Sequence, residues 1–138
     1  MHINSDENKI FDGWNSVKKS VHHDKKLRSF KQRDIFYIKM GQNIGYEQNG
    51  KGDEFVRPVV IFKKFNHDMF FGMPLSTKIK EGRFYYVFEF NKNGIVMKNI
   101  VLLSQLRLFS ANRLLNKIGV MEKNDFKYMK DKFKNLLD

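Results

Sequence analysis

The chain has 138 residues, enough for one domain with a sizeable core but too few for two independently stable domains. Lys and Arg outnumber Asp and Glu by 26 to 15, an excess that either attracts polyanions such as nucleic acids or simply solvates the surface. The chain has no cysteine, which excludes disulfides and thiolate metal sites, and no long apolar run or signal-peptide pattern, so we expect a cytoplasmic protein that does not bind membranes.

Residues 1–29 are predicted to form a helical extension, separate from a main domain over residues 30–138. Ser5 is a typical helix N-cap. Apolar residues follow at helical spacing, namely Ile10, Trp14, Val17 and Val21, and lysines occupy the other face. Such a helix either docks on the domain or binds RNA or a partner, and the sequence leaves both readings open.

From Asp34 onward the pattern changes to short extended runs. Strands are predicted, in chain order, at residues 35–38, 59–62, 69–73, 84–90, 95–97, 100–103 and 106–109. A glycine-rich segment over residues 41–52 follows the first strand. Pro58 favours an extended conformation at Arg57, and Asn93-Gly94 is typical of a hairpin turn.

Two helices are predicted after the strands. Ser110 is expected to cap a short helix that runs through Leu114 and Leu115 and ends at Gly119. A final helix is expected to start near Asn124. Its apolar stripe consists of Phe126, Met129, Phe133, Leu136 and Leu137. Many short strands with few, late helices predict a small curled sheet or barrel.

The chain offers few groups for metal or nucleophilic chemistry. Its four histidines lack partners at zinc-ligand spacing, and neither a phosphate-binding glycine loop nor a Ser/His/Asp arrangement stands out. We therefore expect no metal and no cofactor. The polar residues expected to converge at one rim of a barrel are Tyr46, Glu47, Gln48, Arg57, Ser76, Thr77, Gln105 and Arg107. From the pattern alone, ordinary structural roles for them are equally compatible.

At these residues the chain resembles the MazF/PemK toxin family of type II toxin–antitoxin systems. The matching segments, in order, are residues 32–36 (QRDIF), 44–48 (IGYEQ), 56–61 (VRPVVI), 74–79 (PLSTKI) and 101–107 (VLLSQLR). Each pattern is weak alone, but their order and spacing together are specific. The resemblance extends from about Lys31 to the C-terminal helix.

The resemblance implies a mainly β fold with helices (α+β), a small SH3-like barrel of the MazF/PemK/CcdB type with an added N-terminal helix and a C-terminal helix. It also implies an mRNA interferase: a homodimeric endoribonuclease that cleaves single-stranded RNA sequence-specifically and without metal. The expected products carry 2′,3′-cyclic phosphate and 5′-OH ends. The expected partners are single-stranded RNA and a cognate antitoxin protein.

The resemblance also assigns residues. Arg57 matches the catalytic arginine and Ser76 the catalytic threonine, while Glu47 matches a position that assists as base or holds Arg57. The residues implied to bind RNA are Tyr46, Gln48, Thr77, Lys78, Gln105 and Arg107. Two departures from the family stand out: serine replaces the usual threonine at position 76, and the segment over residues 49–56 is longer than usual, so the RNA sequence preference cannot be transferred. Arg33 also replaces a frequent glycine, which adds a potential phosphate contact.

Two other functions remain open from the sequence. A gyrase poison of the same fold would act through a C-terminal surface rather than through Arg57. A non-catalytic RNA- or partner-binding barrel would be marked by loss of Arg57 or of the hydroxyl at Ser76, and both are kept here.

Overall fold

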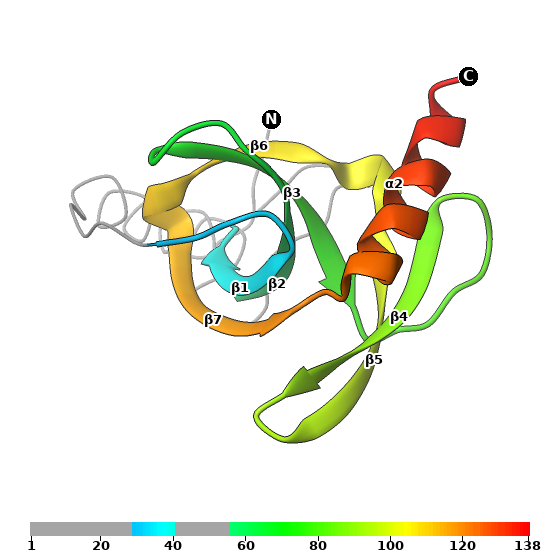
Figure 1. Cartoon of the computed structure of the whole chain (residues 1–138), viewed down its shortest axis with the longest axis horizontal. Coiled ribbons are helices and arrows are strands. Elements are labelled where there is room, and N and C mark those ends of the chain that lie inside the picture. The colour runs from blue at the N-terminus through cyan, green and yellow to red at the C-terminus, as the bar shows by residue number, and fades with distance from the viewer. Residues whose placement is uncertain (1–28, 41–55) are drawn as a thin grey trace, which may run out of the picture.

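The computed structural model describes residues 29–40 and 56–138. This part of the chain forms one seven-stranded antiparallel sheet and a C-terminal helix (Figure 1). The strands are β1 (Asp34–Lys39), β2 (Val56–Lys64), β3 (Met69–Ser76), β4 (Tyr85–Lys92), β5 (Ile95–Leu102), β6 (Arg107–Ser110) and β7 (Leu114–Val120). Two 3₁₀ helices, η1 (Leu103–Gln105) and η2 (Ala111–Arg113), flank β6, and α2 is Lys123–Leu136.

The sheet curls into a half-barrel. Its strand order is β4-β5-β3-β2-β1-β7, and β6 pairs with β3 beside this path. Figure 1 shows β7 curving around β1 and β2, while the β4–β5 hairpin extends away from the barrel. The mainly β architecture with a C-terminal helix confirms the predicted fold. The predicted helix over residues 1–29 lies outside the described residues apart from Ser29.

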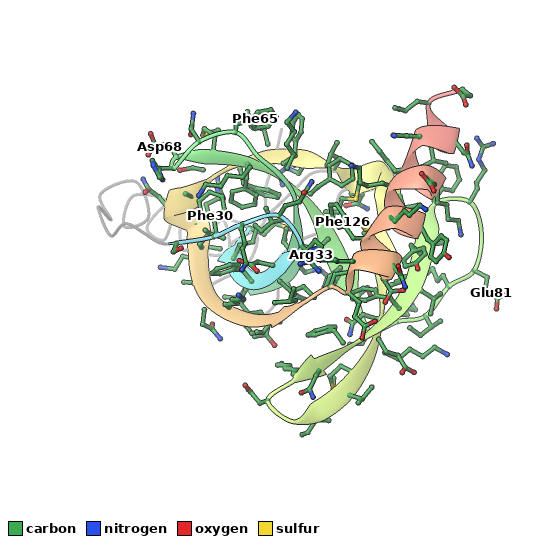
Figure 2. All side chains as sticks on the ribbon, in the orientation of Figure 1. Phe30, Arg33, Phe65, Asp68, Glu81 and Phe126 are labelled. Atoms are coloured by element: carbon green, nitrogen blue, oxygen red, sulfur yellow. The ribbon has the colours of Figure 1, made fainter. Side chains whose placement is uncertain are left out.

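The central strands β1 and β2 are buried on both faces. Along β1, Ile35 packs in a core beneath α2, whereas Phe36 and Ile38 pack in a second core inside the barrel, beneath β6 and β7. Side chains alternate between faces along a strand, so continuous apolar runs fit strands that have a core on each side. Phe30 closes the barrel core against Phe70, with ring centroids 5.3 Å apart (Figure 2).

The structure confirms every predicted strand segment except at three end residues: Phe84 lies in a turn before β4, Leu103 belongs to η1, and Leu106 precedes β6. Asn93 and Gly94 have φ angles of 52° and 83°, both in the left-handed region that a type I′ hairpin turn requires. The final helix also forms where the apolar stripe predicted it. Phe126 and Met129 are its buried residues.

The predicted helix through Leu114 and Leu115 is wrong. Ser110 does cap, because its side chain accepts a hydrogen bond from the Asn112 N–H, but the helical turn ends at Arg113. Residues 114–120 form β7 instead and pair with β1. This pairing closes the barrel, so the tertiary contact overrides the local helix signal.

Gly119 is a packing glycine within β7 rather than a helix terminator. A Cβ at this position would lie 2.6 Å from Cδ2 of Phe90, which is shorter than the contact distance of two non-bonded carbon atoms. The missing side chain therefore lets β4 pack closely on β7.

We predict that Gly119→Ala destabilises the protein by about 1–3 kcal/mol, because the methyl group overpacks the Phe90 ring. The measurement is the free energy of unfolding in urea. The control Asn116→Ala, on an exposed residue of the same strand, should stay within about 0.5 kcal/mol of wild type. Equal stability of Gly119→Ala and wild type would contradict this packing.

A hydrogen bond joins α2 to the sheet. The Tyr86 hydroxyl of β4 donates to Asp125 Oδ1 of α2 at 2.7 Å. Burial, followed by this bond and the nearby Asp125 charge, raises the pKa of Tyr86 above its usual 10.0. Aromatic packing also holds α2 on the sheet, since the ring centroids of Phe62 in β2 and Phe133 in α2 lie 5.4 Å apart. No helix in the described part of the chain is long and apolar enough to cross a membrane.

We predict that stability falls as pH rises above about 10 and that Tyr86→Phe removes much of this dependence. The folded state keeps the phenol proton to higher pH than the unfolded chain does, so the contribution of Tyr86 is complete below the unfolded pKa and is lost above it. Urea midpoints between pH 8 and 11 measure the effect. Identical pH slopes for both proteins would contradict it.

Candidate active site

Arg57 lies near the start of β2 and is almost completely buried. Its side chain is 4% exposed, and its Cα pairs with Ile38 of β1. Pro58 pairs with Tyr37 at the next position. Desolvation by burial lowers the pKa of Arg57 below its usual 12.5. A cation held in low dielectric interacts strongly with an anion that reaches it.

The register of β2 against β3 brings Arg57 and Ser76 together. Val59 pairs with Pro74, and Arg57 and Ser76 each lie two residues beyond this pair on their own strand. Both therefore lie at the same end of the β2–β3 pair. A pocket of about 390 Å³ forms there, lined by Tyr37, Val56, Arg57, Pro58, Leu75, Ser76 and Thr77. We call it the Arg57 pocket.

A local turn positions the Ser76 hydroxyl. Its Oγ accepts a hydrogen bond from the backbone N–H of Lys78 at 3.1 Å. This bond occupies an acceptor site, so the hydroxyl hydrogen can be donated to a ligand in the pocket. Thr77 also lines the pocket, whereas the exposed Lys78 contributes its backbone to the turn.

Lys92 places a second cation beside the pocket. The sequence did not predict a role for this residue. Its Nζ donates a hydrogen bond to the Tyr37 hydroxyl and lies 4.8 Å from the centre of that ring. Tyr37 is a pocket residue, and Lys92 ends β4, which is 55 positions away in the chain. Only the closure of the sheet brings these residues together.

Arg113 is a further residue that the motifs missed. Its Nη1 donates to the backbone carbonyls of Lys39 and Met40, at 2.9 and 3.2 Å. Burial, followed by the positive charge of Arg107, lowers the pKa of Arg113. The guanidinium thus holds the end of β1, and Lys39 pairs there with Val56, the neighbour of Arg57.

Among the described residues, two other predicted site residues lie away from this pocket. Gln105 lies in η1, and Arg107 pairs with Gly72, four residues from Ser76 along β3, which corresponds to about 13 Å. Neither lines the Arg57 pocket. Tyr46, Glu47 and Gln48 lie outside the described residues. Their predicted roles, and that of Lys78, remain predictions.

The arrangement is suited to a tetrahedral or trigonal anion. A guanidinium offers two parallel N–H donors that match a pair of phosphate or carboxylate oxygens, and a hydroxyl supplies a third donor. Among the described residues, no three His, Cys, Asp or Glu side chains cluster in a way that could hold a metal ion.

Three solved structures with the same fold were compared with the chain. MazF (Form-I) from Deinococcus radiodurans has a TM-score of 0.62 at 14% identity, over 80% of this chain and 97% of that one. The Mycobacterium tuberculosis toxin MazF-mt6 has 0.58 at 14%, over 77% and 97%. An endoribonuclease in complex with its cognate antitoxin, from a mycobacterial species, has 0.55 at 9%, over 79% and 95%. No curated protein gives a significant sequence match.

The fold and the Arg57 pocket define a small half-barrel protein whose pocket contains a buried arginine. The family described as PemK-like, MazF-like toxin of type II toxin-antitoxin system matches residues 31–137. The chain belongs to this toxin family.

Proposed function

We propose that the protein is an endoribonuclease toxin that cleaves single-stranded RNA at the Arg57 pocket. The observation that carries the proposal is the placement of Arg57 and Ser76 in one pocket, in a chain of the MazF-like toxin family. The charge excess of the chain favours a polyanionic substrate. The substrate is RNA rather than DNA because the reaction uses the ribose 2′-OH.

The reaction requires three events at one phosphodiester. The 2′-OH loses its proton and attacks the adjacent phosphorus, the charge on the resulting phosphorane is stabilised, and the departing 5′-oxygen gains a proton. The products carry a 2′,3′-cyclic phosphate and a 5′-OH. Cleavage is specific for sequence and needs no metal.

Arg57 holds two non-bridging oxygens of the phosphorane, and the Ser76 hydroxyl donates to the oxygens from the facing strand. Both residues line the pocket before the substrate binds, so little rearrangement is needed for them to stabilise charge as it develops. Arg57 is not the base: an arginine side chain keeps its proton at neutral pH even where burial lowers its pKa. The Glu47 carboxylate matches the family position and is our candidate for accepting the 2′-OH proton.

The protein acts as a homodimer and is neutralised by a cognate antitoxin. Two solved structures with a similar fold support neutralisation by an antitoxin. One is an endoribonuclease in complex with its cognate antitoxin, and the other is a MazE–MazF complex from Deinococcus radiodurans. An acidic antitoxin segment that reaches the Arg57 pocket would compete directly with RNA.

We predict that the purified protein cuts a long single-stranded RNA at discrete sequences in excess EDTA. Arg57→Ala should lower the cleavage rate by about 10³-fold or more, and Ser76→Ala by about 10²-fold, because each removes a donor to the developing charge. Ser76→Thr should restore activity, since threonine keeps the hydroxyl. Sequencing of the 5′-OH ends measures both rate and site.

Matched controls are Arg83→Ala and Ser104→Ala, which change the same residue types at exposed positions away from the pocket. Both should cut at the wild-type rate. Intact RNA with the wild-type protein would reject the ribonuclease, and full activity of Arg57→Ala would reject the site. In the first case, a gyrase relaxation assay tests the alternative toxin activity.

A further inference from the structure

A basic groove runs between α2, the turn before β1 and the C-terminal end of β2, separate from the Arg57 pocket. It consists of two pockets of about 340 and 560 Å³ that share Gln32, Lys130 and Lys134 in their lining. The cations along it are Arg33, Lys63, Lys64, Lys123, Lys127, Lys130 and Lys134. Asp131 is the one acidic side chain among the residues that line the groove.

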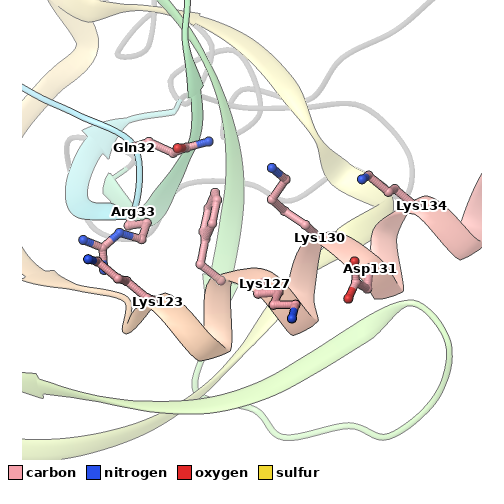
Figure 3. A pocket seen from close by; sticks show the side chains of 8 residues that line it. Gln32, Arg33, Lys123, Lys127, Lys130, Asp131 and Lys134 are labelled. Atoms are coloured by element: carbon pink, nitrogen blue, oxygen red, sulfur yellow. The ribbon is translucent and has the colours of Figure 1, made fainter.

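The lysines of α2 form a regular row. Lys123, Lys127, Lys130 and Lys134 follow one another at intervals of four, three and four residues, close to the helical repeat, which spaces them by roughly 4.5–6 Å along the helix. In Figure 3, Lys123 and Arg33 overlap at one end of the groove and Lys130 extends from the helix toward the strands, whereas Lys127 points away from them. A regular row of cations is complementary to a polyanion that carries one negative charge on each repeating unit.

Arg33 is held in the groove by a strained backbone. Its φ angle is 79°, a left-handed value that side chains other than glycine rarely adopt. Its N–H donates to the Ile61 carbonyl, its carbonyl accepts from the Met121 N–H, and its Nη1 donates to the Met121 carbonyl. The chain thus keeps an arginine at a position where glycine would avoid the strain, which suggests that the guanidinium has a function there.

The donor and acceptor content of the groove favours a phosphodiester over a peptide. The side chains along it are cationic donors or apolar, except for Asp131 and the carbonyl oxygen of Gln32, whose Nε2 donates to the Phe62 carbonyl. A phosphate presents acceptors alone, whereas a bound peptide also presents N–H groups that need acceptors. The half-buried rings of Phe62 and Phe133 supply apolar surface on which bases can stack.

We propose that the basic groove binds the sugar–phosphate backbone of single-stranded RNA outside the cleavage site, without reading its sequence. Lys63 is six residues from Arg57 along β2, or about 20 Å, so the groove holds RNA that flanks the scissile bond. The inference rests on the proposed function, because its ligand is the substrate class of the toxin.

The test measures binding of a fluorescent 20-nucleotide 2′-O-methyl uridine strand by anisotropy over a range of salt concentrations. This strand lacks the attacking hydroxyl, so binding is measured without cleavage. Lys123→Gln/Lys134→Gln should weaken binding roughly tenfold and lower the slope of log K against log salt by about 1.4, since each lost phosphate contact removes about 0.7. Lys80→Gln/Lys98→Gln, with the same charge change at exposed positions outside the groove, should bind like wild type.

Arg33→Gly is a second variant that is expected to fold, because glycine adopts a φ of 79° without strain. Its urea midpoint verifies folding, and its salt slope should fall by about 0.7. Equal losses in the groove pair and the control pair would overturn the proposal. A 20-residue polyglutamate peptide tests for the alternative ligand. If Lys123→Gln/Lys134→Gln weakens binding of this peptide but not of RNA, the groove binds an acidic protein and the proposal is overturned.

The cleavage assay and the binding assay test the two proposals separately, because a different result refutes each of them. A protein that leaves RNA intact but loses strand binding in the groove variants would refute the proposed activity and retain the groove. A protein that cuts RNA through Arg57 but binds the strand equally in all variants would refute the groove alone.

Discussion

The antiparallel pairing of β2 with β3 determines where the candidate catalytic side chains lie. The pairing of Val59 with Pro74 brings together the ends of β2 and β3 that carry Arg57 and Ser76, and both residues line one pocket. A slip of one residue would turn Arg57 to the other face of the sheet. Because β2 packs against a core on each face, burial of its apolar side chains opposes such a slip. The same packing that stabilises the fold therefore aligns the site.

Burial of Arg57 has a cost in folding free energy. A buried guanidinium loses hydration, and the lowered pKa of Arg57 reflects that loss. The apolar cores around β1 and β2 offset this cost. The pocket therefore contains a desolvated cation, whereas the lysines of α2 remain largely in water. On our proposals, the first group stabilises the reacting phosphate and the second holds the flanking strand.

The sequence predicts that Arg57 and Ser76 lie close together, but it does not predict how the barrel closes. Arg57 and Ser76 could be identified because they lie within short ordered motifs, and apolar runs marked the strands that hold them. The contact between Tyr37 and Lys92 could not be predicted, since it depends on the approach of β4 to β1. Residues 114–119 were wrongly predicted as helix because their strand conformation comes from pairing with β1 and from the close approach of Phe90 to Gly119.

A double-mutant cycle between Arg57 and Ser76 tests the central claim most directly. Single-turnover cleavage rates would be measured for wild type, Arg57→Ala, Ser76→Ala and the double variant. Residues that stabilise the same phosphorane act as a unit, so we expect the double variant to be scarcely slower than Arg57→Ala alone. Rate losses that multiply in the double variant would show that the two side chains act independently, and would contradict a shared phosphate site.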